Sequence, residues 1–132
     1  MGHSRAPTRA LADHLERYER VVEVGIGRRT DVASELVDRG VSVTATDVHA
    51  RAVPDGVRFV RDDVVEPNRS VYVGAGAIYA LNQPPELHRP ALAVAREVGA
   101  DFLFTTLGGD EPAVPVRRVT IPGDTLYVAE SG

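Results

Sequence analysis

Residues 21–33 read Val-Val-Glu-Val-Gly-Ile-Gly-Arg-Arg-Thr-Asp-Val-Ala, and this stretch decides the fold. An apolar run ends at two glycines spaced one apart, Gly25 and Gly27, and an amphipathic helical pattern follows directly. Glycines allow the backbone to turn tightly and to approach a ligand closely. A strand that turns sharply into a helix places free backbone N–H groups at the edge of a sheet, where nucleotide-like ligands bind. The stretch therefore predicts a nucleoside-binding α/β fold.

Strand and helix patterns alternate along the chain. Apolar runs predict strands over 21–24, 41–46, 57–60, 77–81 and 102–105, and helical spacing predicts helices over 8–20, 31–39 and 86–98. The last segments, 116–121 and 125–129, flank Pro122-Gly123-Asp124, which is typical of a hairpin. This alternation favours a mainly parallel sheet with right-handed crossovers.

We therefore predict an α/β fold, a single three-layer Rossmann-like domain over residues 1–132 with a C-terminal hairpin. Residues 1–7 are predicted to form a flexible tail. The domain is reduced in size, because the link between Asp47 and Val57 is too short for a full crossover helix. Helices should cover both faces of the sheet and bury apolar residues of its strands and helices. The predicted core includes Val22, Val24, Leu36, Val43, Phe59, Ile78, Leu92 and Leu103.

Composition excludes several classes of function. The 132 residues suffice for one domain with a sizeable core, and they contain no cysteine for a disulfide or a thiolate metal site. All 15 basic residues are arginine, and the net charge of −4 argues against nucleic acid as the main partner, so no DNA is expected. No apolar run is long enough to span a bilayer, and the first residues lack the apolar region of a secretory signal. We expect a cytoplasmic protein without a membrane partner.

Two nucleotide-binding folds begin with such a glycine turn. The dinucleotide fingerprint is G-x-G-x-x-G with an acid about 20 residues further on. Gly25 and Gly27 match it, Thr30 stands at the third glycine position, and Asp47 fits the acid that binds ribose hydroxyls. A nucleotide- or NAD-binding protein is therefore one interpretation of the chain.

The same region resembles class I S-adenosylmethionine-dependent methyltransferases more closely. Their first motif is an acid, any residue, then G-x-G, which Glu23, Gly25 and Gly27 match, while the family's third glycine falls on Arg29. The resemblance implies S-adenosylmethionine as the cofactor, with Glu23, Gly25 and Gly27 among the residues that bind it.

Two further acids are implied by this resemblance. In these methyltransferases an acid at the end of the second strand holds the ribose hydroxyls, which implies Asp47 here. An acid just after the third strand receives the adenine amino group, which implies Asp63, with Asp62 as the alternative. Ionised carboxylates suit both roles because they accept paired hydrogen bonds.

The segment after the fourth predicted strand holds one catalytic candidate. Some methyltransferases that act on amino groups carry Asn/Asp-Pro-Pro-aromatic here, and Asn82-Gln83-Pro84-Pro85-Glu86 is similar to it. Gln83 interrupts the motif and Glu86 replaces the aromatic residue. Asn82 is the catalytic candidate that this similarity implies. The favoured interpretation of the segment is a rigid Pro-Pro turn that begins a helix.

The histidines show no metal-ligand spacing with one another or with acids, so we expect no metal site. Each is interpreted as a lone surface residue: His3, His14, His49 and His88.

Over nearly its full length the chain also resembles an archaeal group known as uncharacterised protein family 0146, small proteins with a Rossmann-like core. The resemblance rests on V-E-V-G-I-G at 22–27, T-D at 46–47, and the segment I-Y-x-x-x-x-P-P-E-L at 78–87. That family has no established activity, so the resemblance implies the fold and leaves the function open.

Two hypotheses for function follow. One is a methyltransferase acting on a macromolecular substrate, with a protein or RNA partner that completes the site, because nothing in so short a chain closes over an acceptor. The other is a non-catalytic module that binds a nucleotide, NAD or a protein. A shared fold does not specify an activity.

Overall fold

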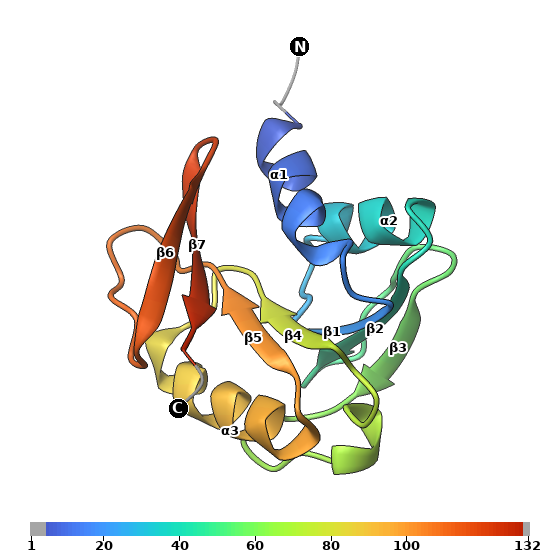
Figure 1. Ribbon diagram of the computed structural model, residues 1–132. Coiled ribbons are helices and arrows are strands. Elements are labelled where there is room, and N and C mark those ends of the chain that lie inside the picture. The colour runs from blue at the N-terminus through green and yellow to red at the C-terminus, as the bar shows by residue number, and fades with distance from the viewer. Residues whose placement is uncertain (1–4, 131–132) are drawn as a thin grey trace.

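The computed structural model describes residues 5–130. Its strands are β1 (Arg20–Val24), β2 (Ser42–Asp47), β3 (Arg58–Arg61), β4 (Ala77–Ala80), β5 (Asp101–Phe104), β6 (Val116–Ile121) and β7 (Asp124–Ala129). In this part of the chain the seven strands form one sheet in the order β3-β2-β1-β4-β5-β7-β6 (Figure 1). The pairs from β3 to β5 are parallel, while β7 runs antiparallel to both β5 and β6. The predicted parallel sheet with a C-terminal hairpin is confirmed.

Helices cover both faces of this sheet, so the predicted three layers are also confirmed (Figure 1). The helices α1 (Ala6–Leu15) and α2 (Asp31–Asp38) lie on one face, and α3 (His88–Val98) lies on the other. Two short 3₁₀ turns precede β4 and α3: η1 (Arg69–Val71) and η2 (Pro85–Leu87).

Successive residues of each strand point to opposite faces and therefore feed two separate hydrophobic clusters. On β1, Val21 joins the cluster beneath α1 and α2, whereas Val22 and Val24 join the cluster beneath α3. Of the predicted core residues, all are buried except Phe59, which is only partly buried. Phe59 lies on β3, an edge strand that pairs with β2 alone, so one side of it has no neighbouring strand.

Three predicted helix boundaries differ from the structure by two residues or more, while the other predicted helix and the five predicted parallel strands differ by one residue at most at either end. The first helix ends at Leu15 rather than at residue 20, because the chain then turns and Arg20 already pairs in β1. That helix begins at Ala6, so the last residues of the predicted tail are helical. Pro7 suits the first turn, because N–H groups there have no partner within the helix and the missing N–H of proline costs no hydrogen bond. Residues 1–4 of the tail lie outside the described residues. The predicted helix over 86–98 opens with η2, and its α-helical part starts at His88.

The link between β2 and β3, residues 48–57, contains no helix, as its length predicts. It folds against α2, where Val53 and Val57 join the cluster beneath that helix.

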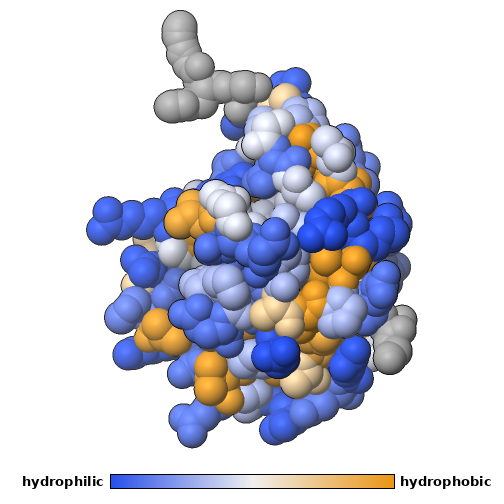
Figure 2. Space-filling model, turned by 90° about the vertical axis from the view of Figure 1, so that its left-hand side faces the viewer, coloured by the Kyte–Doolittle hydropathy of each residue, from blue (hydrophilic) through white to orange (hydrophobic). Residues whose placement is uncertain are grey.

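The outer strand on the hairpin side of the sheet is β6. Figure 2 views this side and shows a mostly hydrophilic surface with apolar residues in a narrow band and in small groups. Exposed charges on β6, including Arg117 and Arg118, discourage pairing with another sheet edge.

Within residues 5–130, no helix has the length and apolar character needed to cross a bilayer.

Two glycines with nearly the same backbone conformation test how tightly the β2–β3 link packs. Gly40 and Gly56 have φ of +87° and +88°, but a Cβ on Gly56 would lie 2.6 Å from Val37 Cγ1, whereas nothing lies within 4 Å at Gly40. Both alanine variants share the cost of a left-handed backbone, about 1–2 kcal/mol. We expect Gly56→Ala to lower the free energy of unfolding by a further ~1–3 kcal/mol, because the methyl group overpacks the site. Urea denaturation measures both values. Equal losses would mean that Val37 moves aside freely.

Candidate functional site

The carboxyl ends of β1 and β2 are held together by the glycine turn. The backbone N–H groups of Gly25 and Ile26 both donate to the Thr46 carbonyl oxygen, at 2.9 and 3.0 Å. Gly25 and Gly27 have φ of +69° and +56°, which L-residues with a Cβ rarely adopt. The turn thus needs its two glycines, and it directs the chain into α2 at the edge of the sheet.

Asp47, the last residue of β2, lies directly beside this turn. Its Oδ2 accepts a hydrogen bond from Gly27 N–H at 2.8 Å, and its Oδ1 accepts one from His49 N–H at 3.0 Å. The Arg51 guanidinium adds an ion pair, with Nε 3.4 Å from Oδ2. Burial raises the pKa of Asp47, but the two backbone hydrogen bonds and Arg51 outweigh it, so the pKa lies below its usual value. Asp47 is therefore an ionised carboxylate at neutral pH.

The two acids after β3 have different surroundings. Asp62 accepts hydrogen bonds from Asn68 N–H at 2.9 Å and from the Tyr72 hydroxyl at 2.6 Å, so both of its oxygens hold the following turn. Asp63 is exposed, and within the described part of the chain its side chain accepts one hydrogen bond, from Val65 N–H to Oδ1 at 2.9 Å. Of the two, Asp63 is the one with an oxygen available to a ligand.

Glu23 points beneath the sheet edge rather than into solvent. It is 1% exposed, and its Oε1 accepts a hydrogen bond from the Tyr79 hydroxyl at 2.7 Å. Its Oε2 is buried without a hydrogen-bond partner in the described residues. Burial raises the pKa of Glu23 to about 8, although the Tyr79 hydrogen bond and Arg29 act in the opposite direction. Glu23 is therefore mostly protonated at neutral pH and lies under the glycine turn.

Asn82 follows β4 at the same edge, because β4 pairs with β1 in parallel. Among the described residues it is the one non-glycine with a positive φ, +51°, and its backbone N–H donates to Thr105 Oγ1 at 2.8 Å. Its side chain is exposed. The chain then enters Pro84 and the η2 turn, so the interpretation of Pro84-Pro85 as a rigid turn before a helix is confirmed.

Gln83 and His88 are buried next to Asn82, and the prediction of a surface position for His88 was wrong. His88 Nε2 lies 3.1 Å from the Gln83 carbonyl oxygen, and its Nδ1 accepts a bond from Ala113 N–H at 3.0 Å. Since Ala113 N–H can only donate, Nε2 carries the proton. The ring also packs on Phe104 with centroids 4.2 Å apart, and burial lowers the pKa of His88. A neutral histidine thus joins the strand β4 end to the loop before β6.

The Gln83 side chain is 3% exposed, and neither its amide nitrogen nor its amide oxygen has a hydrogen-bond partner in the described residues. No local sequence signal indicated the burial of His88, because the Ala113 N–H and the Phe104 ring that contact it lie on distant segments. Two of the predicted cofactor-binding acids have separate partners. The Asp47 side chain bonds to the glycine turn, whereas the Asp63 side chain bonds to Val65 N–H.

Exposed apolar residues surround this edge of the sheet. Val48, Val65 and Leu107 are 48%, 55% and 66% exposed, and they follow the carboxyl ends of β2, β3 and β5. The N–H groups of Gly25, Ile26 and Gly27 are bonded within the turn, so the expected free backbone donors are not found at these three residues. The edge combines the glycine turn with an ionised carboxylate, an exposed amide and apolar side chains. Within residues 5–130 no group of histidine and acidic residues could hold a metal ion.

The buried carboxyl of Glu23 predicts a pH dependence of stability. Its pKa is about 8 when folded and 4.5 in the ordinary, unfolded state. Between these values the unfolded chain has lost the proton and the folded chain has kept it. The free energy of unfolding therefore falls as pH rises, by up to about 1.4 kcal/mol per pH unit from this group. We expect Glu23→Gln to remove this fall, so that its stability relative to wild type increases with pH in denaturation curves.

Glu66, an exposed residue, supplies the control. The difference in stability between Glu66→Gln and wild type should stay constant over the same pH range. Parallel pH profiles for wild type and Glu23→Gln would contradict the assignment of the raised pKa to Glu23.

The fold is similar to that of solved methyltransferases. The methyltransferase domain of bacterial CtHen1-CN superposes with a TM-score of 0.65 at 11% identity, covering 94% of this chain and 98% of that one. The methyltransferase PaMTH1 of Podospora anserina gives 0.62 at 8% identity, over 99% and 80% of the two chains. The glycopeptide N-methyltransferase MtfA gives 0.60 at 18% identity, over 98% and 65%. These likenesses show a methyltransferase-like Rossmann fold.

Proteins of higher identity come from archaea. A UPF0146 protein of Halobacterium salinarum is 55% identical over 120 residues, which cover 90% of this chain and 93% of the relative. A UPF0146 protein of Archaeoglobus fulgidus is 52% identical over 89% and 91% of the two chains. One from Pyrococcus furiosus is 32% identical over 83% and 86%.

The sequence model of the same family matches residues 7–131, which include the glycine turn, Asp47, Asp63 and Asn82. Together with the archaeal relatives, this match shows that the chain belongs to the uncharacterised protein family UPF0146.

Proposed function

We propose that this protein binds S-adenosylmethionine at the carboxyl edge of β1, β2 and β3 and methylates a macromolecular acceptor. The observation that carries the proposal is the contact between Gly27 N–H and Asp47 Oδ2, 2.8 Å long. It places a glycine turn and an ionised carboxylate on neighbouring parallel strands. Open α/β sheets bind ligands at this edge, where the strand order reverses, which here is between β1 and β4.

The residues at this edge fit the cofactor. A carboxylate has about four acceptor positions, and the backbone uses two of those on Asp47, which leaves acceptors for ribose hydroxyls. Val48, 48% exposed, offers an apolar surface to a purine ring beside the ribose. Asp63 has an oxygen available for an exocyclic amino group.

The acid in the first turn of α2 favours S-adenosylmethionine over NAD, although Arg28 and Arg29 precede it. The diphosphate of a dinucleotide would lie at the start of α2, but this turn holds Asp31. Although burial raises the pKa of Asp31, hydrogen bonds from Thr8 and Arg29 lower it below its usual value, so the carboxylate is ionised and repels phosphate. S-adenosylmethionine carries a positive sulfonium and no phosphate. Structures of similar fold are described with S-adenosylhomocysteine or sinefungin, which supports the same ligand class.

When bound, S-adenosylmethionine supplies an electrophilic methyl group on its sulfonium, and the contribution of this chain is positioning. The exposed Asn82 side chain can accept a hydrogen bond from an N–H group of the substrate that receives the methyl group. Its backbone, at φ +51°, is the kind of strained conformation that clusters at functional sites. The buried Gln83 amide beside it lacks partners, whereas buried polar groups nearly always have one. Both features support a ligand or ordered water at this position.

A large acceptor suits the open rim of this edge. The apolar side chains of Val48, Val65 and Leu107 lie exposed around it, and apolar groups with polar neighbours are typical of surfaces that bind another macromolecule. A protein or RNA substrate could cover this rim and exclude water from the methyl transfer, which the short loops of this chain do not do alone.

A non-catalytic binding module is the second candidate. The observation that favours it is the Arg51–Asp47 ion pair, which balances the charge of the carboxylate without any ligand. In that case Asp47 would serve only to hold the glycine turn.

We expect S-adenosylmethionine to bind more tightly than NAD in calorimetric titrations. Asp47→Ala should weaken this binding at least tenfold, which corresponds to about 1.4 kcal/mol, because the ribose hydroxyls lose a charged acceptor. Asp55→Ala is the matched control, since Asp55 is an exposed acid in the β2–β3 link and the change in net charge is the same. Tighter binding of NAD, or equal weakening by both variants, would contradict the proposal.

Methyl transfer is tested with labelled S-adenosylmethionine, first with small amines and then with cell extract separated into RNA and protein. We expect little turnover of small acceptors and labelling of a macromolecule. Asn82→Gly should abolish the labelling while preserving the fold, because glycine adopts a positive φ without strain. Robust methylation of a small amine by the protein alone would contradict a macromolecular acceptor. Binding of the cofactor without any labelling would favour the non-catalytic module.

A further inference from the structure

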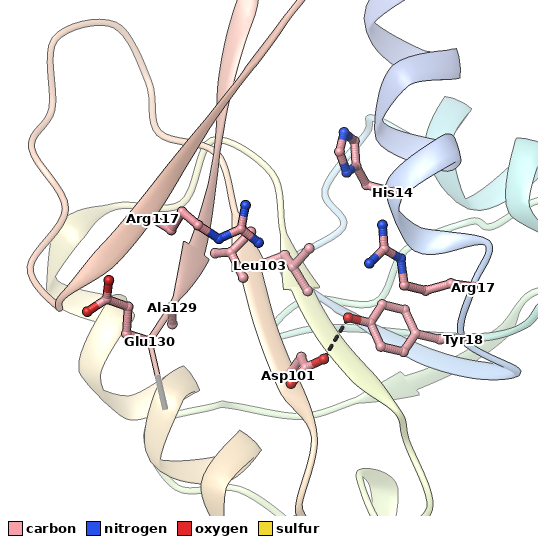
Figure 3. A pocket seen from close by; sticks show the side chains of 9 residues that line it. His14, Arg17, Tyr18, Asp101, Leu103, Arg117, Ala129 and Glu130 are labelled. Carbon is pink, nitrogen blue, oxygen red and sulfur yellow. Dashed lines mark hydrogen bonds between the residues drawn. The ribbon is translucent and has the colours of Figure 1, made fainter. Parts of the chain in front are cut away.

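A pocket lies at the amino ends of the parallel strands, whereas the glycine turn lies at their carboxyl ends. It opens between the carboxyl end of α1 and the β6–β7 hairpin, above the first half of β5 (Figure 3). Asp101 begins β5, so the pocket is near the amino ends of the parallel strands. Its volume is about 510 Å³, which is within the range of small-molecule sites. Leu103 and Val128 contribute apolar side chains to it.

Three hydrogen-bond donors from two walls face this pocket. Arg17 and His14 come from the α1 side, and Arg117 comes from β6; their nitrogen atoms point into the space above Leu103 (Figure 3). Arg17 and Arg117 have no ion pair in the described residues, although the chain as a whole is acidic. Their opposed directions suit a tetrahedral anion better than a planar one, because its oxygens also point in several directions.

An oriented carboxylate lies below these donors. Asp101 Oδ2 accepts a hydrogen bond from the Tyr18 hydroxyl at 2.7 Å, and Oδ1 stays available to another donor. Burial and the Asp101 carboxylate raise the pKa of Tyr18 to about 12, so the phenol keeps its proton and continues to orient Asp101. A carboxylate accepts hydrogen bonds only, so a group that reaches it must be a donor such as a hydroxyl.

We propose that this pocket binds a phosphate monoester that carries a neighbouring hydroxyl, with the phosphate on Arg17, Arg117 and His14 and the hydroxyl on Asp101. A free sugar phosphate and the 5′-terminal nucleotide of an RNA share this chemistry. Glu130 lies on the far side of Arg117 and adds a negative charge to the same wall (Figure 3). Its carboxylate weakens phosphate binding, and Glu130→Gln should therefore strengthen it.

The test uses ribose 5-phosphate, inorganic phosphate and ribose in calorimetric titrations of the whole chain at low ionic strength. Ribose 5-phosphate contains no adenine, and free ribose reports any binding of the sugar alone beside Asp47. We expect ribose 5-phosphate to bind at least tenfold more tightly than inorganic phosphate and ribose not to bind detectably. Arg117→Gln and Arg17→Gln should each weaken ribose 5-phosphate at least tenfold. Asp101→Asn should narrow the difference in affinity between ribose 5-phosphate and inorganic phosphate, because the sugar hydroxyl loses its charged acceptor while both ligands are freed from the same repulsion.

Arg118→Gln is the matched control, because Arg118 is adjacent on β6 and its guanidinium lies over the Tyr127 ring, 5.6 Å from the centroid. It removes the same charge and should change the affinity less than twofold. Competition by a 5′-phosphorylated RNA oligonucleotide, but not by its unphosphorylated form, would assign the site to an RNA end; absence of competition would assign it to a free sugar phosphate. No binding of ribose 5-phosphate at millimolar concentration, or equal losses in Arg117→Gln and Arg118→Gln, would overturn the proposal. The same variants are also titrated with S-adenosylmethionine. Their affinity for it should be unchanged, which separates this test from that of the proposed cofactor site.

Discussion

The hydrogen bond from Gly27 N–H to the Asp47 carboxylate connects the glycine turn after β1 to the end of β2. The Thr46 carbonyl oxygen accepts two further N–H groups of the same turn, so three backbone donors are satisfied by neighbouring residues of one strand. Hydrogen bonds to an ionised acceptor are among the stronger ones in proteins. They hold a turn that only glycines adopt easily, and they start α2 at the edge of the sheet. This turn therefore fixes the position of the Asp47 carboxylate relative to the start of α2.

The reduced architecture leaves both edges of the sheet accessible. At the carboxyl edge, the β2–β3 link folds back on α2 without forming a helix. At the amino edge, α1 and the β6–β7 hairpin diverge above β5 and leave the polar pocket between them (Figure 3). A larger protein would place more chain over both regions. The proposed binding at either end of the strands involves few residues, so single substitutions can test the two sites separately.

Buried polar groups lie directly beneath the carboxyl edge and run against ordinary core composition. Among residues 5–130, one oxygen of Glu23 and both polar atoms of the Gln83 amide have no hydrogen-bond partner, although burying a polar group without a hydrogen bond costs free energy. Tyr79 and His88 compensate in part, by donating to Glu23 and by fixing the Gln83 carbonyl. Such departures from local rules concentrate at functional sites in natural proteins. Their position at this edge agrees with the strained backbone of Asn82.

The amino-acid sequence alone determined the order of strands and helices, the glycine turn, Asp47 at a strand end, the helix-free link and the C-terminal hairpin, because local periodicity and turn residues encode these features. The insertion of β7 between β5 and β6, the partial exposure of Phe59 and the burial of His88 depend on which elements become neighbours. Tyr79 meets Glu23 across 56 positions, and Ala113 meets His88 across 25. Contacts of this kind, and the pocket between α1 and β6, were decided only by the tertiary structure, since burial and hydrogen bonding there arise between segments whose separation in sequence carries no local signal.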